Sequence, residues 1–402
     1  MRTLFSVHAV LRSAGRYISA SILASVVGLT ATTAHAQWQD PLDTPAMSTL
    51  KAHKSLLLDV TNAGERLVAV GERGHIIFSN DEGRTWRQAK TPVITTLTAV
   101  YFVNENTGWA VGHDAVVLNT QDGGMTWVKQ FDGFKANEMV LNSAKQTKEL
   151  YESELSKAMV LGSDARISLA EENLENATYA LEDAQIDFEE KSTKPLLDLW
   201  FKNVKEGFVI GAYGMMFKTI DGGNTWMAWA TRVENPDRFH LNSITRIDDQ
   251  RLMMVGEAGL MLRTQDGGET WKQMLSPYDG SFFGVMNLSN NVQLAFGLRG
   301  NLARSDNFGL SWRLEDTHTQ QTLMGATDHL GRIAYVVGNG GAFLKGIDSG
   351  RKWESQTRTG RSSASSIIET RSGDFVMVGE NGVEILDKTG ERLSVEIKSI
   401  EG

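Results

Sequence analysis

The sequence predicts an all-β fold, a seven-bladed β-propeller whose blades carry aspartate-containing turns and which is interrupted by an inserted α-helical hairpin. Three observations predict it. An eight-residue motif recurs along the chain, a Gly-x-x-Gly motif precedes it at intervals of mostly 41 residues, and one glycine-poor stretch breaks this period. A repeat of about 40 residues is typical of propellers, in which each four-stranded blade buries its faces against its neighbours.

The chain begins with a segment that we expect to be an export signal. It carries three basic residues, Arg2, Arg12 and Arg16. An apolar stretch, residues 18–31, follows, and Ala-His-Ala at residues 34–36 has the pattern that signal peptidases cleave. We therefore predict a signal peptide over residues 1–36, cut after Ala36, and a periplasmic or secreted mature protein with no membrane span. An uncleaved signal anchor is the alternative, although a membrane span needs about 20 apolar residues.

Composition excludes several classes of function. The 402 residues include 40 Lys and Arg against 49 Asp and Glu, which argues against a nucleic-acid partner. The chain has no cysteine, so it has no disulfide, thiolate zinc site, iron–sulfur cluster or cysteine nucleophile. His75 and His113 lie near matching turns, but two histidines without a third ligand are weak evidence for a metal site. We expect no metal and no cofactor.

The eight-residue motif joins an acidic turn to a tryptophan. Its six copies pair Asp81 with Trp86, Asp122 with Trp127, Asp221 with Trp226, Asp266 with Trp271, Asn307 with Trp312, and Asp348 with Trp353. The aspartate can accept bonds from turn amides, and the tryptophan can fill the wedge between blades. Metal or sugar binding by these turns is the alternative, but a turn that recurs from blade to blade favours a structural role.

One repeat can be followed strand by strand. Its four strands, a to d from the inside outward, are expected at residues 97–102, 109–111, 115–120 and 127–131. On this pattern, residues 37–134 form blades 1 and 2, and residues 195–402 form blades 3 to 7. The seventh blade lacks the motif, and residues 42–48 are a candidate for the strand that completes it.

The inserted segment, residues 135–194, is expected to be an antiparallel helical hairpin. Its second half has apolar residues three and four apart: Ile167, Ala170, Leu174, Ala177, Leu181, Ala184 and Phe188. Gly162 and Ser163 mark the break between two helices of about 25 residues each. The hairpin has 7 Lys and Arg against 13 Asp and Glu. It is either a solvated arm packed on itself or the propeller, or a docking arm for a protein partner.

The turns between strands b and c are the predicted recognition surface. In propellers they share one rim with the d–a connections, one of which holds the hairpin. The partner-binding hypothesis names ten residues of these turns: Glu72, Arg73, His113, Asp114, Tyr213, Glu257, Arg299, Asn339, Glu380 and Asn381. The alternative is that these are seven solvated turns without a common function.

The repeats carry a family resemblance. The eight-residue motif resembles the Asp-box, or BNR, repeat of sialidases, some glucanases and sortilin-type receptors. The full pattern of V-G-x-x-G followed by T-x-D-G-G-x-T-W resembles the photosystem II assembly and stability factor family of seven-bladed propellers. That resemblance implies an assembly factor for membrane proteins, or, in bacterial relatives, a periplasmic accessory of RND-type exporters. It also implies an arginine patch, for which Arg73, Arg299 and Arg304 are candidates.

We therefore predict a non-catalytic periplasmic propeller that binds a protein partner, either a membrane-protein complex or an exporter. A glycoside hydrolase of the Asp-box type is the alternative. Such an enzyme needs two carboxylates across a cleft, and four acids lie on the predicted surface: Glu72, Asp114, Glu257 and Glu380. The Arg-Ile-Pro signature typical of sialidases is absent, and no nucleophile elbow supports a Ser-His-Asp triad.

Overall fold

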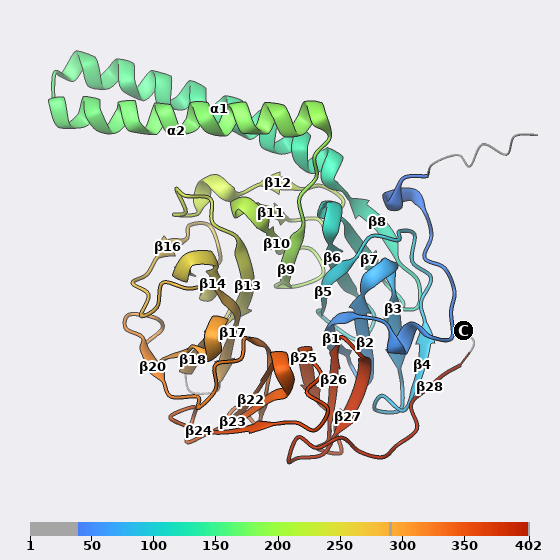
Figure 1. The fold of residues 1–402 in the computed structure, drawn as a ribbon. Coiled ribbons are helices and arrows are strands. Elements are labelled where there is room, and N and C mark those ends of the chain that lie inside the picture. Colours follow the sequence, from blue (N-terminus) through green and yellow to red (C-terminus); the bar gives the residue numbers. More distant parts are fainter. Residues whose placement is uncertain (1–38, 289–291, 401–402) are drawn as a thin grey trace, which may run out of the picture. The chain divides into compact units, whose positions relative to one another are not determined.

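The computed structural model describes residues 39–288 and 292–400, so the predicted signal peptide lies outside the described residues. It confirms the predicted propeller, with seven sheets arranged around a central axis (Figure 1). The innermost strands contact one another in chain order, and the last of them contacts the first, which closes the ring.

We number the sheets as blades 1 to 7. Blade 1 contains β1 (Leu57–Ala63), β2 (Arg66–Gly71), β3 (Ile76–Ser79), β4 (Thr85–Gln88) and β28 (Lys398–Ser399). Blade 2 contains β5 (Leu97–Phe102), β6 (Gly108–Gly112), β7 (Val117–Thr120) and β8 (Val128–Phe131). Blade 3 contains β9 (Leu196–Phe201), β10 (Gly207–Gly211), β11 (Met216–Thr219) and β12 (Met227–Ala228). Blade 4 contains β13 (Leu241–Arg246), β14 (Leu252–Gly256), β15 (Met261–Thr264) and β16 (Lys272–Gln273).

The remaining blades repeat this plan. Blade 5 contains β17 (Phe282–Leu288), β18 (Val292–Gly297), β19 (Leu302–Ser305) and β20 (Arg313–Glu315). Blade 6 contains β21 (Leu323–His329), β22 (Ile333–Gly338), β23 (Ala342–Ile347) and β24 (Lys352–Thr357). Blade 7 has three strands, β25 (Ala364–Glu369), β26 (Phe375–Gly379) and β27 (Gly382–Leu386). Chain neighbours within each blade pair antiparallel.

The ring closes differently from the prediction. Residues 42–48 form no strand; a 3-10 turn at Pro41–Asp43 is the regular element there. Instead the C-terminal strand β28 pairs in parallel with β4, as the amide of Lys398 donates to the carbonyl of Arg84 at 3.0 Å. The N-terminal segment supports this strand from the side, because Nδ1 of His53 lies 2.7 Å from Oγ of Ser399. Both ends of the described chain therefore meet on blade 1.

The hydrophobic core is divided among the seams between blades. Trp127 of blade 2 packs against Val68 and Phe78 of blade 1, and Trp86 of blade 1 packs against Val376 of blade 7. Five of the six motif tryptophans are buried: Trp86, Trp127, Trp226, Trp271 and Trp353. Trp312 is half-buried. The indoles therefore fill the wedges between blades, as the sequence predicted.

In blades 1 to 5 the aspartate or asparagine of the motif accepts an amide hydrogen bond within its turn, as predicted. For Asp348 in blade 6 the prediction is wrong: its side chain is exposed, and within the described residues it accepts no such bond. In blade 4, Asp266 accepts bonds from the amide and the hydroxyl of Thr270, at 3.0 and 2.7 Å, and from the hydroxyl of Thr264 at 2.6 Å. Partial burial alone would raise the pKa of Asp266, but these bonds outweigh it and lower the pKa to about 2. The hydrogen bonds of this carboxylate therefore stabilise its own turn.

Two aspartates of the innermost strands link neighbouring blades. Asp59 in β1 accepts a bond from the amide of Val100 in blade 2 at 3.0 Å. Asp198 in β9 accepts one from the amide of Ile244 in blade 4 at 2.8 Å. Burial raises the pKa of Asp59 to about 6. Burial, with a contribution from the charge of Asp59, raises the pKa of Asp198 to about 7.

This burial predicts a pH-dependent stability. Both pKa values are raised above the ordinary 3.8, so protonation stabilises the fold, and that stabilisation is lost as the pH rises through 6 and 7. Relative to Asp198→Asn, the wild-type free energy of unfolding should fall by up to about 1.4 kcal/mol per pH unit between pH 4 and 7. Urea titrations at several pH values measure it. The control Asp266→Asn removes a lowered pKa, so its difference from the wild type should stay constant between pH 4 and 7 and change, with the opposite sign, only below about pH 4. A pH-independent difference for Asp198→Asn between pH 4 and 7 would contradict the prediction.

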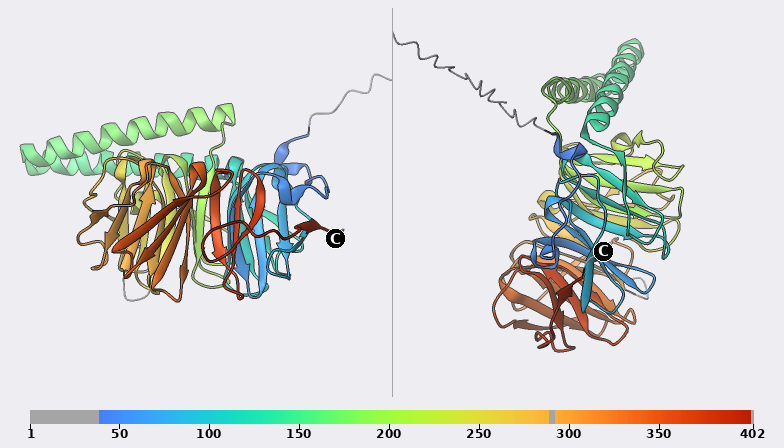
Figure 2. Two further views of the ribbon diagram at one scale, coloured as in Figure 1. Left: turned by 60° about the horizontal axis from the view of Figure 1, so that its bottom comes forward. Right: turned by 90° about the vertical axis from the view of Figure 1, so that its right-hand side faces the viewer.

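The insertion is an antiparallel helical hairpin, as predicted. The helices α1 (Gly133–Leu161) and α2 (Asp164–Glu190) lie side by side above one rim of the ring (Figure 2). Gly162 ends α1 in the left-handed conformation, with φ 64°. No helix in the described residues is long and apolar enough to cross a membrane.

The seam between the helices is built mainly from alanine. Ala170, Ala177 and Ala184 are buried on α2, which lets the two backbones approach closely. Phe188 was predicted to belong to this seam, but its side chain is 45% exposed. That part of the prediction is wrong, because the seam ends near the base of the hairpin, where Asn137 of α1 instead bonds the carbonyls of Asp187 and Ser192.

Candidate functional site

The b–c turns share one backbone conformation. After the first glycine, each turn of blades 1 to 6 runs through a short 3-10 segment whose middle residue is left-handed. That residue is Arg73, Asp114, Tyr213, Ala258, Arg299 or Gly340, with φ between 50° and 61°. A non-glycine residue in this conformation is uncommon, and five of the six turns have one there, two of them an arginine. Of the ten predicted binding residues, seven are exposed at these tips: Arg73, His113, Tyr213, Arg299, Asn339, Glu380 and Asn381.

The glutamates of the predicted surface serve their own blades. Oε1 of Glu72 accepts the amide of Leu56 at 3.2 Å, and the amide of Glu72 donates back to the carbonyl of Leu56 at 3.0 Å. Glu257 and Glu380 make the same reciprocal pair, with His240 and Ser363 respectively. These carboxylates close the turn against the start of the innermost strand.

Asp114 holds the base of the hairpin. Its two carboxylate oxygens accept bonds from the hydroxyls of Thr95 and Thr193, both at 2.7 Å. Thr193 follows α2, and α1 contacts the turn that contains Asp114. This aspartate therefore ties blade 2 to both ends of the insertion, and all four acids considered for hydrolysis are engaged in local hydrogen bonds.

A cleft of about 240 Å³ lies between the hairpin and blade 3. Its walls include the small or apolar side chains of Val140, Ala144, Ala180, Met215 and Ala228. It opens beside the b–c turn of blade 3, so the hairpin and the turns lie on the same rim. A cavity of about 150 Å³ already accepts benzene, so the cleft has room for an apolar side chain.

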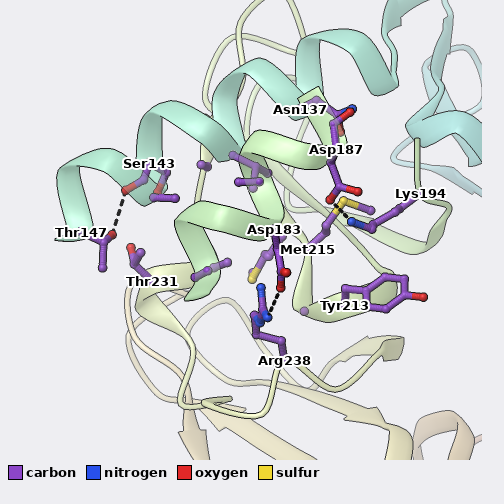
Figure 3. Close-up of a pocket in the computed structure, with 18 of the residues that line it drawn as sticks. Asn137, Ser143, Thr147, Asp183, Asp187, Lys194, Tyr213, Met215, Thr231 and Arg238 are labelled. Carbon is purple, nitrogen blue, oxygen red and sulfur yellow. Dashed lines mark hydrogen bonds and ion pairs between the residues drawn. The ribbon is translucent and has the colours of Figure 1, made fainter. Parts of the chain in front are cut away.

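Charged side chains border this cleft (Figure 3). Asp183 of α2 pairs with Arg238 of the blade 3–4 connection at 2.6 Å. Asp187, one turn further along α2, pairs with Lys194, whose ammonium lies 5.0 Å from the ring centre of Tyr213. These pairs hold the hairpin against blade 3, and their four charged side chains line the cleft beside its apolar ones.

The series of contacts from Asp187 through Lys194 to Tyr213 continues onto blade 4. The ring of Tyr213 lies 4.9 Å from that of His240, and Nδ1 of His240 lies 2.8 Å from Oε2 of Glu257. The structure thus brings the predicted residues Tyr213 and Glu257 together beside the hairpin, and a third predicted residue, Asp114, holds the base of the hairpin. The sequence did not identify Lys194, Arg238 or the two aspartates of α2. Asp183 and Asp187 are four residues apart on one helix face, but nothing in their spacing shows which blade they meet.

The other predicted residues lie elsewhere on the ring. Glu72 and Arg73 face a separate cavity at blade 1. The prediction that Arg304 contributes to a surface arginine patch is wrong, because its side chain is only 1% exposed. Its Nε donates to the carbonyl of Ser349 in the next blade at 2.8 Å, so it joins two blades on the opposite rim. The described residues contain no group of three or more His, Asp or Glu side chains that could hold a metal ion.

Comparisons with known proteins agree on the fold. The family model of the photosynthesis system II assembly factor YCF48 matches residues 85–149 and 176–332. Among solved structures, YCF48 bound to D1 peptide is 16% identical with a TM-score of 0.58, covering 83% of this chain and 93% of that one. YCF48 from Cyanidioschyzon merolae is 14% identical with a TM-score of 0.56, covering 86% and 98%. No curated protein sequence matches the chain.

The propeller also resembles an enzyme. The GH74 enzyme of Niastella koreensis is 12% identical with a TM-score of 0.54, and the match covers 87% of this chain and 54% of that enzyme. At such identities the likeness concerns the fold alone, since propellers of one architecture serve unrelated functions.

Proposed function

Because the chain belongs to the photosystem II assembly factor YCF48 family, we propose that it is a non-catalytic factor that binds a membrane-protein complex during assembly or as an accessory subunit. The observation that carries the proposal is the cleft in which the hairpin meets blade 3. A protein of the same fold has been solved with a peptide bound, which supports a peptide ligand here.

The cleft suits a peptide segment that inserts one apolar side chain. The helix alanines and Met215 would surround that side chain, and the exposed ring of Tyr213 would cover its flank. Aromatic side chains at the edge of a small apolar pocket are the usual anchors of protein interfaces. The acidic hairpin would add selectivity for a partner with basic residues next to the inserted one.

The proposed site of action is the periplasm, and the proposed partners are a photosystem-like complex or an RND-type exporter. The support is the basic and apolar leader with its Ala-His-Ala end at residues 34–36. Mass spectrometry of the protein purified from its native cell should find an N-terminus at Gln37. A chain that keeps residues 1–36 would instead favour a membrane anchor.

We do not assign hydrolysis to the acids of the rim. Glu72, Asp114, Glu257 and Glu380 each accept a hydrogen bond within the propeller or at the base of the hairpin. Carboxylates used in this way close turns, whereas a glycosidase pair faces a shared substrate cleft.

A bulky substitution in the cleft tests the proposal. Ala180 on α2 is half-buried and lines the cleft, so Ala180→Trp should fill it without removing a hydrogen bond. After cross-linking in intact cells, the wild-type protein should capture an integral membrane protein, and Ala180→Trp should reduce that capture roughly tenfold. Replacing residues 135–194 by a short linker should abolish it.

The neighbouring Tyr179 provides the control. Its side chain is 55% exposed and does not line the cleft, so Tyr179→Trp should leave capture unchanged. Melting curves should show both variants folded. Equal capture by wild type and Ala180→Trp would contradict the proposal, as would the absence of any membrane protein among the captured species.

A further inference from the structure

A second cavity lies at blade 1, formed by the N-terminal segment and the b–c turn. Its volume is about 660 Å³, within the range of ligand-binding pockets. It is lined by Met47, Thr49, Lys51, Lys54, Ser55, Glu72, Arg73, His75 and Ile94. Apart from Ile94, these residues precede Thr85, where the match to the family model begins. The family-model match therefore does not include these residues, apart from Ile94.

Three basic side chains that form no ion pair with the described residues line the cavity. Lys51, Lys54 and Arg73 are exposed, and none of them forms an ion pair with an acidic side chain of residues 39–288 or 292–400. Glu72 is the one acidic side chain among the lining residues, and its Oε1 already accepts the amide of Leu56. Three basic side chains and one carboxylate therefore line the cavity, an excess of positive charge.

The inner wall contains a buried polar group without a partner. His75 is 5% exposed, and its Nδ1 has no hydrogen-bond partner among the described residues. An unpaired buried donor or acceptor lowers stability, and His75 is one of the residues that line the cavity. Burial lowers the pKa of His75, so the ring is neutral at pH 7 and can donate one hydrogen bond.

We propose that this cavity binds an acidic peptide segment, with its carboxylates at Lys51, Lys54 and Arg73 and one acceptor on His75. The volume exceeds that of a single inorganic anion, and the exposed side chains of Met47 and Ile94 can contact apolar residues of the peptide. A membrane surface is disfavoured, because the chain carries an excess of acidic residues and the hairpin on the same rim has 13 of them against 7 basic ones. A short acidic peptide can contact the three basic side chains of the cavity without also lying against the acidic hairpin, as an extended anionic membrane would.

Fluorescence anisotropy with the purified protein tests the site directly. The probe is the labelled peptide Gly-Glu-Leu-Asp-Glu-Leu-Asp-Gly, and its twin carries Gln and Asn in place of Glu and Asp. We expect the acidic peptide to bind more tightly than the neutral twin and to weaken with added salt. The triple variant Lys51→Gln/Lys54→Gln/Arg73→Asn should bind it roughly tenfold more weakly. His75→Phe keeps the ring and should also weaken binding.

Arg299 gives a matched control, because it occupies the same exposed left-handed position in blade 5 as Arg73 does in blade 1. Arg299→Asn should leave the affinity unchanged. Equal affinity of the triple variant and the wild type, an equal loss with Arg299→Asn, or unchanged binding by His75→Phe would overturn the proposal.

Two further probes separate the sources of negative charge. Phosphatidylglycerol vesicles that bind through the same three cations, while the peptide does not, would assign the cavity to lipid and overturn the proposal. Displacement of the peptide by low millimolar inorganic phosphate would reduce the site to a simple anion site and would also overturn it. Because these assays use a peptide and not the captured membrane protein, their failure leaves the proposed function of the hairpin cleft intact.

Discussion

Replacing Trp86 by alanine should lower the free energy of unfolding by about 3–5 kcal/mol, the range measured for buried aromatic residues. Trp86 is fully buried at the seam where blade 7 meets blade 1. Its indole also donates to the carbonyl of Gly83 at 2.7 Å, and its backbone pairs with the closing strand β28. The substitution therefore leaves a cavity at the one seam that is closed by chain ends.

The repeat supplies its own control. Trp312 holds the same motif position in blade 5, but it is half-buried, so Trp312→Ala should cost clearly less. Urea unfolding followed by far-ultraviolet circular dichroism measures both variants without relying on tryptophan fluorescence. Equal losses in the free energy of unfolding would contradict the prediction, because they would show that the tryptophan at the seam between blades 7 and 1 stabilises the protein no more than Trp312 does.

The second large effect is expected at a buried ion pair between blades 6 and 7. Nη1 of Arg358 lies 2.8 Å from Oε2 of Glu384, and the two side chains are 3% and 7% exposed. Removing one partner of such a pair leaves an uncompensated charge in a low-dielectric site. Glu384→Ala should therefore destabilise the protein by about 3–5 kcal/mol.

Two comparisons identify the cause of that loss. The double variant Arg358→Met/Glu384→Leu replaces both charges by apolar groups and should recover much of the stability. Arg246→Ala removes an exposed pair, that of Arg246 with Asp249, and should change stability by less than about 1 kcal/mol. If the double variant were no more stable than Glu384→Ala, lost packing and not the unpaired charge would explain the effect.

The propeller could be predicted because its signals are local and repeated. In five of the six copies the motif side chain bonds to residues of its own turn, as Asp266 does to Thr264 and Thr270. The number of Gly-x-x-Gly motifs, spaced mostly 41 residues apart, gives the number of blades. The apolar spacing of residues 167–184 predicts the contact between the two helices. These features depend on neighbours within a few residues, which a single sequence displays.

The partners of surface charges could not be predicted in this way. Lys194 and Arg238 reach α2 because the hairpin lies against blade 3, and nothing in the sequence sets that angle. Likewise, Lys51 and Lys54 line the same cavity as Arg73 because the N-terminal segment passes over blade 1.

The residue pattern alone therefore specifies seven small sheets, the tryptophan-filled seams and an acidic helical insertion. Three-dimensional packing settles how the ring is closed, which acids are used in turns and which basic residues remain unpaired. The reason is the range of the interactions: turns and strand pairing are set by residues close in sequence, whereas β28 on β4, or the hairpin on blade 3, depends on surfaces that exist only after the ring has formed.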